Sequence, residues 1–100
     1  MLRMVRVTGE SLSPLFQEGD YVLITTIPFV VNKIKAGDTI VFLNPSYGTL
    51  IKQVEQANRE EGTISVVGLN PNSVDSRRFG PIRWEDVIGK VIWHIARPAW

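Results

Sequence analysis

Residues 37–55, with the sequence GDTIVFLNPSYGTLIKQVE, contain the pattern that decides the fold of this chain. A Gly-Asp turn leads into an apolar run at residues 39–43, and an Asn-Pro pair with a later glycine separates it from a second run at residues 50–55. Both runs are rich in β-branched and aromatic residues, which favour strands, whereas glycine, asparagine and proline favour tight turns. The stretch therefore predicts two short strands joined by a turn.

The same succession of strands and turns extends over the rest of the chain. In residues 3–8 the valines point to one face and Arg6 and Thr8 to the other, which is the period of a half-buried strand. Further strands are expected at residues 21–25, 63–67 and 87–95, and a short helical turn at residues 11–17. We therefore predict a mainly β chain, with one small β-barrel-like domain of several antiparallel strands over residues 1–100.

The composition is that of a single globular domain with few options for metal or redox chemistry. The 100 residues are 44% hydrophobic and 21% charged, enough for one small core. Eleven basic and ten acidic side chains give a net charge of +1, so we expect no nucleic acid partner. Cysteine is absent and histidine occurs once, which excludes thiolate nucleophiles and the usual zinc ligand sets. We expect no metal and no cofactor.

No segment has the length and hydropathy of a membrane span. The longest apolar stretch, residues 21–31, is interrupted by two threonines and Pro28. The N-terminus also lacks the basic, apolar and small-residue regions of a signal peptide, so a cytoplasmic location is the expectation. Tryptophan suits either a core or a membrane surface, and we expect Trp84 and Trp93 to be at least partly buried.

Lys52 is the residue of the strand-like run 50–55 that best suits a chemical role. On a strand it shares a face with the aliphatic side chains of Leu50 and Val54. Contact with apolar surface dehydrates an ammonium and lowers its pKa from about 10.4, which favours a neutral amine able to act as a general base. The alternative is an edge-strand lysine whose stem packs while its charge stays in water. The pattern alone leaves both interpretations open.

Several other side chains have groups suited to nucleophilic or acid–base chemistry. Ser11 lies where a strand gives way to a turn, which would expose both its hydroxyl and its own backbone N–H, although a serine there is also a common helix N-cap. His94 would be the only base for a Ser-His-Asp triad, and its place near the end of a strand favours a surface or packing role. Glu60 and Glu61 lie in a turn that ends in glycine, and we expect both to be solvated.

Five segments, in order along the chain, resemble motifs of the signal peptidase I family of serine proteases. GESLSP at residues 9–14 resembles the Gly-x-Ser-Met-x-Pro motif of the nucleophile, and IKQV at 51–54 resembles the Lys-Arg-Val motif of the general base. EGDYVL at 18–23 and GDTIV at 37–41 resemble the Gly-Asp strands between them. The last block, GLN at 68–70 with NSVDSR at 72–77 and FG at 79–80, is similar to the family's Gly-Asp-Asn…Ser-x-Asp-Ser-Arg…Gly.

The resemblance implies a role for each matching position. Ser11 would be the nucleophile, Lys52 the general base and Ser73 the hydroxyl that orients the lysine amine. The N–H of Ser11 would hold the oxyanion, and Asp75 and Arg77 would form a structural ion pair. An extended precursor or peptide would bind as an added strand beside those that carry the nucleophile and the base. The implied substrate-binding positions are Gly9, Leu12, Phe16 and Ile51.

The chain also departs from the family pattern. Leucine replaces the usual methionine, threonine and aspartate at positions 12, 15 and 69, and Gln53 replaces the arginine, but no proposed catalytic atom is lost. We expect neither a membrane anchor nor an inserted domain. In this respect the chain is similar to the small proteases that trim nickel superoxide dismutase precursors. Peripheral membrane association through a partner stays compatible with this. The alternatives are a LexA-like self-cleaving peptidase domain and a catalytically lapsed peptide-binding domain. LexA-like proteins normally carry a DNA-binding segment and a cleavage site in cis, and we expect neither in this chain.

Overall fold

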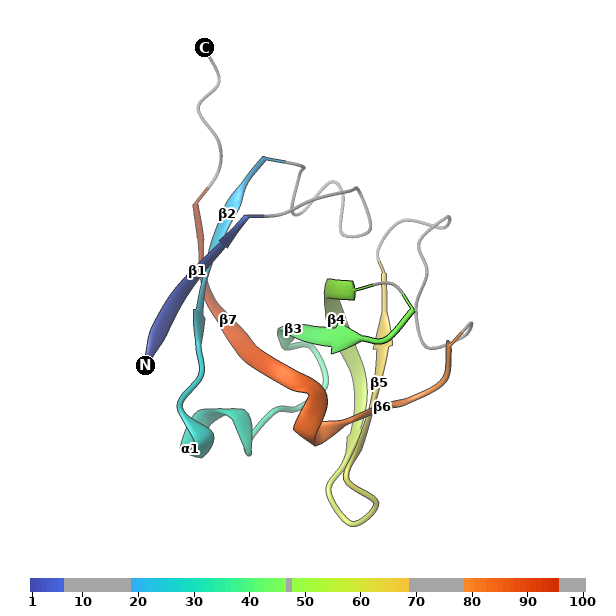
Figure 1. The fold of residues 1–100 in the computed structure, drawn as a ribbon. Helices are drawn as coiled ribbons and strands as arrows, with labels where there is room; N and C mark the ends of the chain where they lie inside the picture. The colour runs from blue at the N-terminus through green and yellow to red at the C-terminus, as the bar shows by residue number, and fades with distance from the viewer. Residues whose placement is uncertain (7–18, 47, 69–78, 96–100) are drawn as a thin grey trace.

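A computed structural model describes residues 1–6, 19–46, 48–68 and 79–95 of the chain as one antiparallel sheet with two short helical segments (Figure 1). Its elements are β1 (Leu2–Arg6), β2 (Tyr21–Thr25), α1 (Pro28–Val31), β3 (Thr39–Asn44), β4 (Gly48–Asn58), β5 (Thr63–Val67), β6 (Ile82–Arg83), the 3-10 turn η1 (Trp84–Asp86) and β7 (Val87–Ile95).

The order of the strands places the first and the last strand, β1 and β7, on either side of β2. The sheet runs β1-β2-β7-β3-β4-β5-β6, with every neighbouring pair antiparallel, so the last strand lies between β2 and β3. Among the described residues β1 and β6 are the two edges and do not pair with each other, so the sheet is open rather than a closed barrel. The predicted mainly β, antiparallel domain is confirmed.

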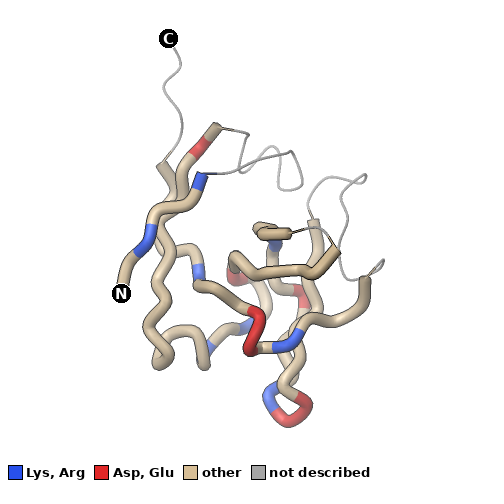
Figure 2. The backbone as a smooth tube through the Cα atoms, viewed as in Figure 1, with Lys and Arg blue, Asp and Glu red and all other residues tan. Residues whose placement is uncertain are grey.

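The predicted turns that fall in the described residues separate the strands as expected. Residues 59–62 form the turn between β4 and β5, and Glu60 and Glu61 are exposed at the charged tip of this hairpin (Figure 2). Gly62 has a φ of +70°, a left-handed conformation that glycine adopts without strain. The hairpin turn is therefore a solvated structural feature, with no carboxylate pair held in a buried site.

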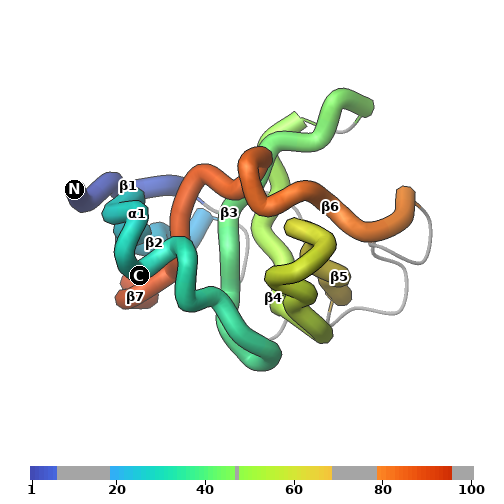
Figure 3. The backbone as a smooth tube through the Cα atoms, turned by 90° about the horizontal axis from the view of Figure 1, so that it is seen from below, coloured from blue at the N-terminus to red at the C-terminus, as the bar shows by residue number. Residues whose placement is uncertain are grey.

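Residues of β3 and β4 alternate between two hydrophobic clusters on opposite faces of the sheet. Val41 and Ile51 pack in the first cluster, whereas Ile40, Phe42 and Val54 pack in the second. β1, β2 and β7 lie on one side of β3, and β4, β5 and β6 lie on the other (Figure 3). The first cluster consists of Val22, Ile24, Val41 and Ile51, and the second of Ile34, Ile40, Phe42, Val54, Ile64, Val66 and Ile82. The central strands thus face a core on both sides.

The strands at 21–25, 63–67 and 87–95 form with the predicted bounds, and β4 is longer than predicted at both ends. The sequence pattern did not predict α1 or β6. Four residues with the sequence PFVV look like a continued apolar strand, and only Pro28 at the first helical position signals the turn. A two-residue strand such as β6 has no periodicity to detect. The helical turn predicted at residues 11–17 lies outside the described residues.

Two neighbouring residues of β3 allow a test of which side chains are buried in a cluster and which are exposed. Phe42 is fully buried in the second cluster, whereas Leu43 is 54% exposed. Phe42→Ala removes a buried ring and leaves a cavity, so we expect the free energy of unfolding to fall by about 3–5 kcal/mol. Leu43→Ala serves as the control and should change it by less than about 0.5 kcal/mol. Urea unfolding measures both, and equal losses would contradict the assignment of faces.

Candidate functional site

Lys52 is a buried lysine on a central strand. β4 pairs with β3 on one side and β5 on the other, and Lys52 lies opposite Ile40 of β3. Its neighbours on the same face of β4 are Leu50 and Val54, both part of or packed against the second cluster. Only 2% of the Lys52 surface is accessible. The alternative of an edge-strand lysine with its charge in water is therefore wrong.

Burial on this scale bears directly on what the amine of Lys52 does. A lysine whose stem packs but whose charge stays in water keeps its terminal nitrogen exposed, and a side chain with 2% accessible surface does not. Dehydration disfavours the charged ammonium relative to the neutral amine. Lysines are rarely buried completely in proteins, because the cost of removing the charge from water is large. A buried lysine therefore calls for a functional explanation.

Of the other site residues predicted from the sequence, the structure describes only Ile51. Ile51, the neighbour of Lys52, is buried on the opposite face in the first cluster beside Val41. Its assignment to a substrate pocket stays a prediction. The remaining positions lie outside the described residues, so the dyad, the ion pair and the other substrate contacts also stay predictions: Gly9, Ser11, Leu12, Phe16, Ser73, Asp75 and Arg77.

A buried carboxylate meets the single histidine of the chain at one end of β2. His94 Nε2 lies 2.7 Å from Asp20 Oδ2, and the Asp20 side chain is 5% exposed whereas that of His94 is 31% exposed. Asp20 immediately precedes β2, and β7 places His94 opposite Val22. The partners are 74 positions apart in the sequence, which explains why sequence reasoning missed the pair. A carboxylate that fixes an imidazole is two-thirds of a Ser-His-Asp triad, so this pair must be tested beside Lys52.

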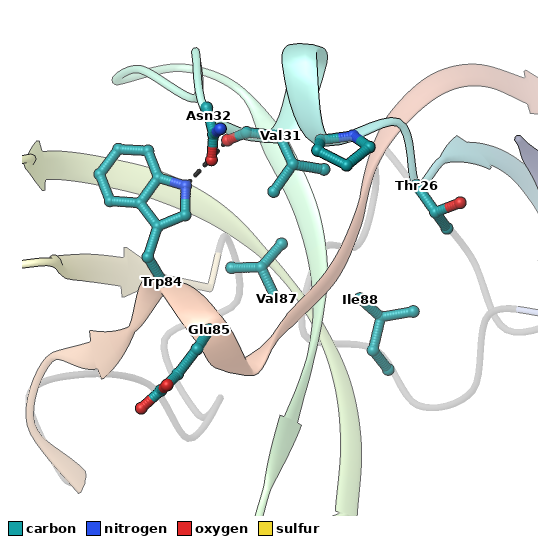
Figure 4. Close-up of a pocket in the computed structure, with 8 residues that line it drawn as sticks. Thr26, Val31, Asn32, Trp84, Glu85, Val87 and Ile88 are labelled. Carbon is teal, nitrogen blue, oxygen red and sulfur yellow. Dashed lines mark hydrogen bonds between the residues drawn. The ribbon is translucent and has the colours of Figure 1, made fainter.

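Two shallow grooves lie at the end of the sheet where α1 faces η1 and the start of β7. The larger, about 410 Å³, has an apolar wall that includes Pro28, Val31 and Val87 (Figure 4). The smaller, about 290 Å³, is lined by Asn32, Arg59, Gly62 and Trp84. The Trp84 indole Nε1–H donates a hydrogen bond to the Val31 carbonyl at 2.8 Å, which fastens η1 to α1. Lys52 lines neither groove, so these hollows are separate from the candidate base.

The described part of the chain holds neither a cluster of three or more histidine, aspartate or glutamate side chains placed to bind a metal ion nor a helix long and apolar enough to cross a membrane.

Comparison with known proteins gives a family but no individual relative. The model of the Peptidase S24-like family matches residues 1–92, which include all the strands except the end of β7. No curated protein shows a significant match to the chain. The matched region contains Lys52 and the two segments outside the described residues that hold Ser11 and Ser73.

A double-mutant cycle tests whether the interaction between Asp20 and His94 stabilises the fold. Asp20→Asn and His94→Ala should each lower the free energy of unfolding, and the double variant should lose less than the sum. The short hydrogen bond to a buried carboxylate predicts a coupling of about 0.5–3 kcal/mol in urea unfolding. The exposed pair Arg83–Glu85, with 2.9 Å between nitrogen and oxygen, is the control and should show a coupling near zero. Equal couplings would mean that the buried pair has no special role.

Proposed function

Because the chain belongs to the Peptidase S24-like family, we propose that it is a serine endopeptidase in which Ser11 is the nucleophile and Lys52 the general base. The observation that carries the proposal is the burial of Lys52, with 2% of its surface accessible, on a central strand between aliphatic neighbours. An amine that serves as a general base must be neutral when the substrate is bound, and burial favours that state.

The proposed reaction is acyl transfer in two steps. The Lys52 amine takes the proton of the Ser11 hydroxyl as the serine oxygen attacks the scissile carbonyl, and the N–H of Ser11 stabilises the oxyanion. Lys52 then gives the proton to the leaving amine, and the C–N bond breaks to form an acyl-enzyme. A water molecule, deprotonated by the same amine, then attacks the ester. The amine returns this proton to the Ser11 oxygen as the ester C–O bond breaks, which frees Ser11 and the new carboxylate end. In this scheme Ser73 orients the amine of Lys52.

For the substrate we propose an extended segment near the N-terminus of a precursor protein, removed as a pro- or signal segment. Among the described residues, positions 48–52 of β4 pair with β3 but not with β5, and this open side next to Lys52 suits a peptide that binds as an added strand. Leu12, Phe16 and Ile51 would line the pockets for its side chains, with Gly9 beside the nucleophile. This candidate follows the resemblance to signal peptidase I, and it is similar to the small maturation proteases of nickel superoxide dismutase.

The family match also favours a second candidate, because it places the chain among S24 and LexA-like peptidases. In that case the same Ser11 and Lys52 would cut a segment of their own polypeptide rather than a separate precursor. The two candidates share the chemistry and differ in whether the rate depends on a second protein. Mass spectrometry of the purified chain over time distinguishes them, since self-cleavage shortens the chain without any added peptide.

We expect the purified protein to cut one of a set of precursor peptides that includes a nickel superoxide dismutase N-terminus and an Ala-x-Ala signal peptide. Mass spectrometry of the new termini identifies the cleaved bond. Ser11→Ala and Lys52→Ala should each lower kcat by about 10⁴-fold or more, since removing either member of a nucleophile–base pair removes most of the acceleration. If neither the peptides nor the chain itself is cut, a catalytically lapsed peptide-binding domain becomes the better explanation.

Lys52→Arg tests whether Lys52 acts as a general base or only supplies a positive charge. Arginine keeps a long cationic side chain but does not lose its proton at accessible pH, so the variant should be as inactive as Lys52→Ala. Unfolding in urea checks that the Arg and Ala variants still fold. His94→Ala is the matched control for the other candidate base, and it should keep activity within about tenfold of the parent chain. An inactive His94→Ala beside an active Lys52→Arg would overturn the dyad in favour of a Ser-His-Asp mechanism.

A further inference from the structure

The two grooves where α1 faces η1 adjoin each other and differ in chemistry. Both are lined by Asn32 and Trp84, and we call them together the α1–η1 groove. Its larger part has apolar walls from α1 and from the start of β7, whereas its smaller part contains Arg59 of the turn between β4 and β5. An apolar part and a cationic end therefore lie side by side.

Two hydrogen bonds between distant parts of the chain hold the walls of the α1–η1 groove. The Trp84 indole N–H donates to the Val31 carbonyl, and Arg59 donates through Nη2 to the carbonyl of the next residue, Asn32. Two successive carbonyls at the end of α1 thus accept hydrogen bonds from η1 and from the β4–β5 turn. The guanidinium of Arg59 is therefore held at the groove, although its side chain belongs to an exposed hairpin turn.

The indole of Trp84 offers its apolar ring to the groove. Trp84 is half-buried, as predicted, because it packs against the second cluster. Its N–H is already bonded to Val31, so the ring rather than a free donor is available to a ligand. Trp93 on β7 is by contrast 65% exposed, and the prediction that it is at least partly buried is wrong.

The charge left on the walls of the α1–η1 groove is positive. Arg59 is exposed and makes no ion pair within the described part of the chain. Glu85 also lines the groove, but it pairs with Arg83 at 2.9 Å, and its side chain points away from α1 (Figure 4). Glu60 and Glu61 follow Arg59 in the turn and line neither part of the groove. A single guanidinium is thus the charge that a ligand would meet.

We propose that the α1–η1 groove binds a peptide segment in which a carboxylate side chain stands next to a large apolar residue. The bond to Asn32 uses one of the five N–H donors of Arg59 and leaves others for the two parallel hydrogen bonds that a carboxylate accepts. The apolar residue would enter the larger part, beside the ring of Trp84. With about 410 Å³, that part is within the range of about 300–1,000 Å³ typical of ligand clefts.

A polyanion such as a nucleic acid fits the α1–η1 groove less well than a peptide does. Polyanions are bound by several cations at once, and Arg59 is the one cation among the described residues that line the groove. The exposed carboxylates of Glu60 and Glu61, next in the chain, would repel a dense negative charge. One guanidinium beside an apolar wall matches one carboxylate beside an apolar side chain.

This binding does not depend on the proposed peptidase activity. Lys52 lines neither part of the groove, so the peptide would bind away from the candidate base. Binding is measured on the parent chain and repeated on Ser11→Ala, and the two should agree. Loss of binding and loss of cleavage are therefore separate results.

The test is an NMR titration of the isotope-labelled whole chain with the peptide Gly-Ser-Leu-Glu-Ser-Gly, blocked at both ends. The indole N–H of Trp84 and the amide of Gly62 should shift along one saturable curve that gives Kd. Replacing the glutamate of the peptide by glutamine should raise Kd at least about tenfold, because a charged hydrogen bond is lost. Replacing its leucine by alanine should raise Kd about tenfold, because the buried apolar side chain is lost.

Arg59→Gln should raise Kd for the Leu-Glu peptide at least about tenfold and leave Kd for the Leu-Gln peptide unchanged. The second result shows that the apolar part of the groove still forms without the guanidinium. Arg3→Gln is the matched control, since Arg3 is an exposed arginine on β1 that lines neither part of the groove. It should change neither value, and urea unfolding verifies that both variants fold.

Three results would overturn the proposal. The first is that no peptide shifts the resonances of Trp84 and Gly62 at millimolar concentration. The second is that the Leu-Gln peptide binds as tightly as the Leu-Glu peptide, or that Arg3→Gln weakens binding as much as Arg59→Gln does. The third is that the same resonances shift with protein concentration when no peptide is present, which would make a second copy of the chain the occupant.

Discussion

The fold depends on the insertion of β7 between β2 and β3. Without that strand, β1 and β2 would have no backbone pairing with the sheet formed by β3 to β6. The junction is so close that a Cβ atom at Gly89 would lie 2.7 Å from the Thr25 carbonyl oxygen and 3.0 Å from the Ile24 side chain. Glycine is therefore the residue that lets the backbones of β2 and β7 approach here. The strands on both sides of β7 then belong to one sheet, with a register shift in the pairing of β7 with each neighbour.

That arrangement produces the two hydrophobic clusters and buries Lys52 on the side of the second one. Because β3 and β4 are covered on both faces, their alternating side chains enter the first cluster and the second in turn. Lys52 lies opposite Ile40 of β3 and shares its face of β4 with Val54. A charged group at such a place lowers the stability of a small domain, which has little stability to spare. The burial of Lys52 is the physical basis for treating it as a chemical group rather than a packing residue.

The same strand order leaves one half of the sheet covered on a single face. The second cluster is closed by β5, β6 and η1, but no described element covers the outer face of β1, β2 and β7. The core and the exposed face therefore alternate along β2, with Val22 and Ile24 inside and Tyr21 and Leu23 on the other side. A buried amine on one part of the sheet and an exposed apolar face on another are separate properties, and each arises from the way the strands are arranged.

The sequence by itself determined the strands, the turns and the face of Lys52, because these depend on the two-residue period and on local turn chemistry. The family motifs around Ser11 and Lys52 were likewise visible in the sequence, and they agree with membership of a peptidase family. Only the tertiary structure decided that Lys52 is buried, that Asp20 meets His94 and that Trp93 is exposed. The physical reason is that alternation shows which residues share a face, whereas the strand order, set by contacts between residues far apart in the chain, decides which faces are covered.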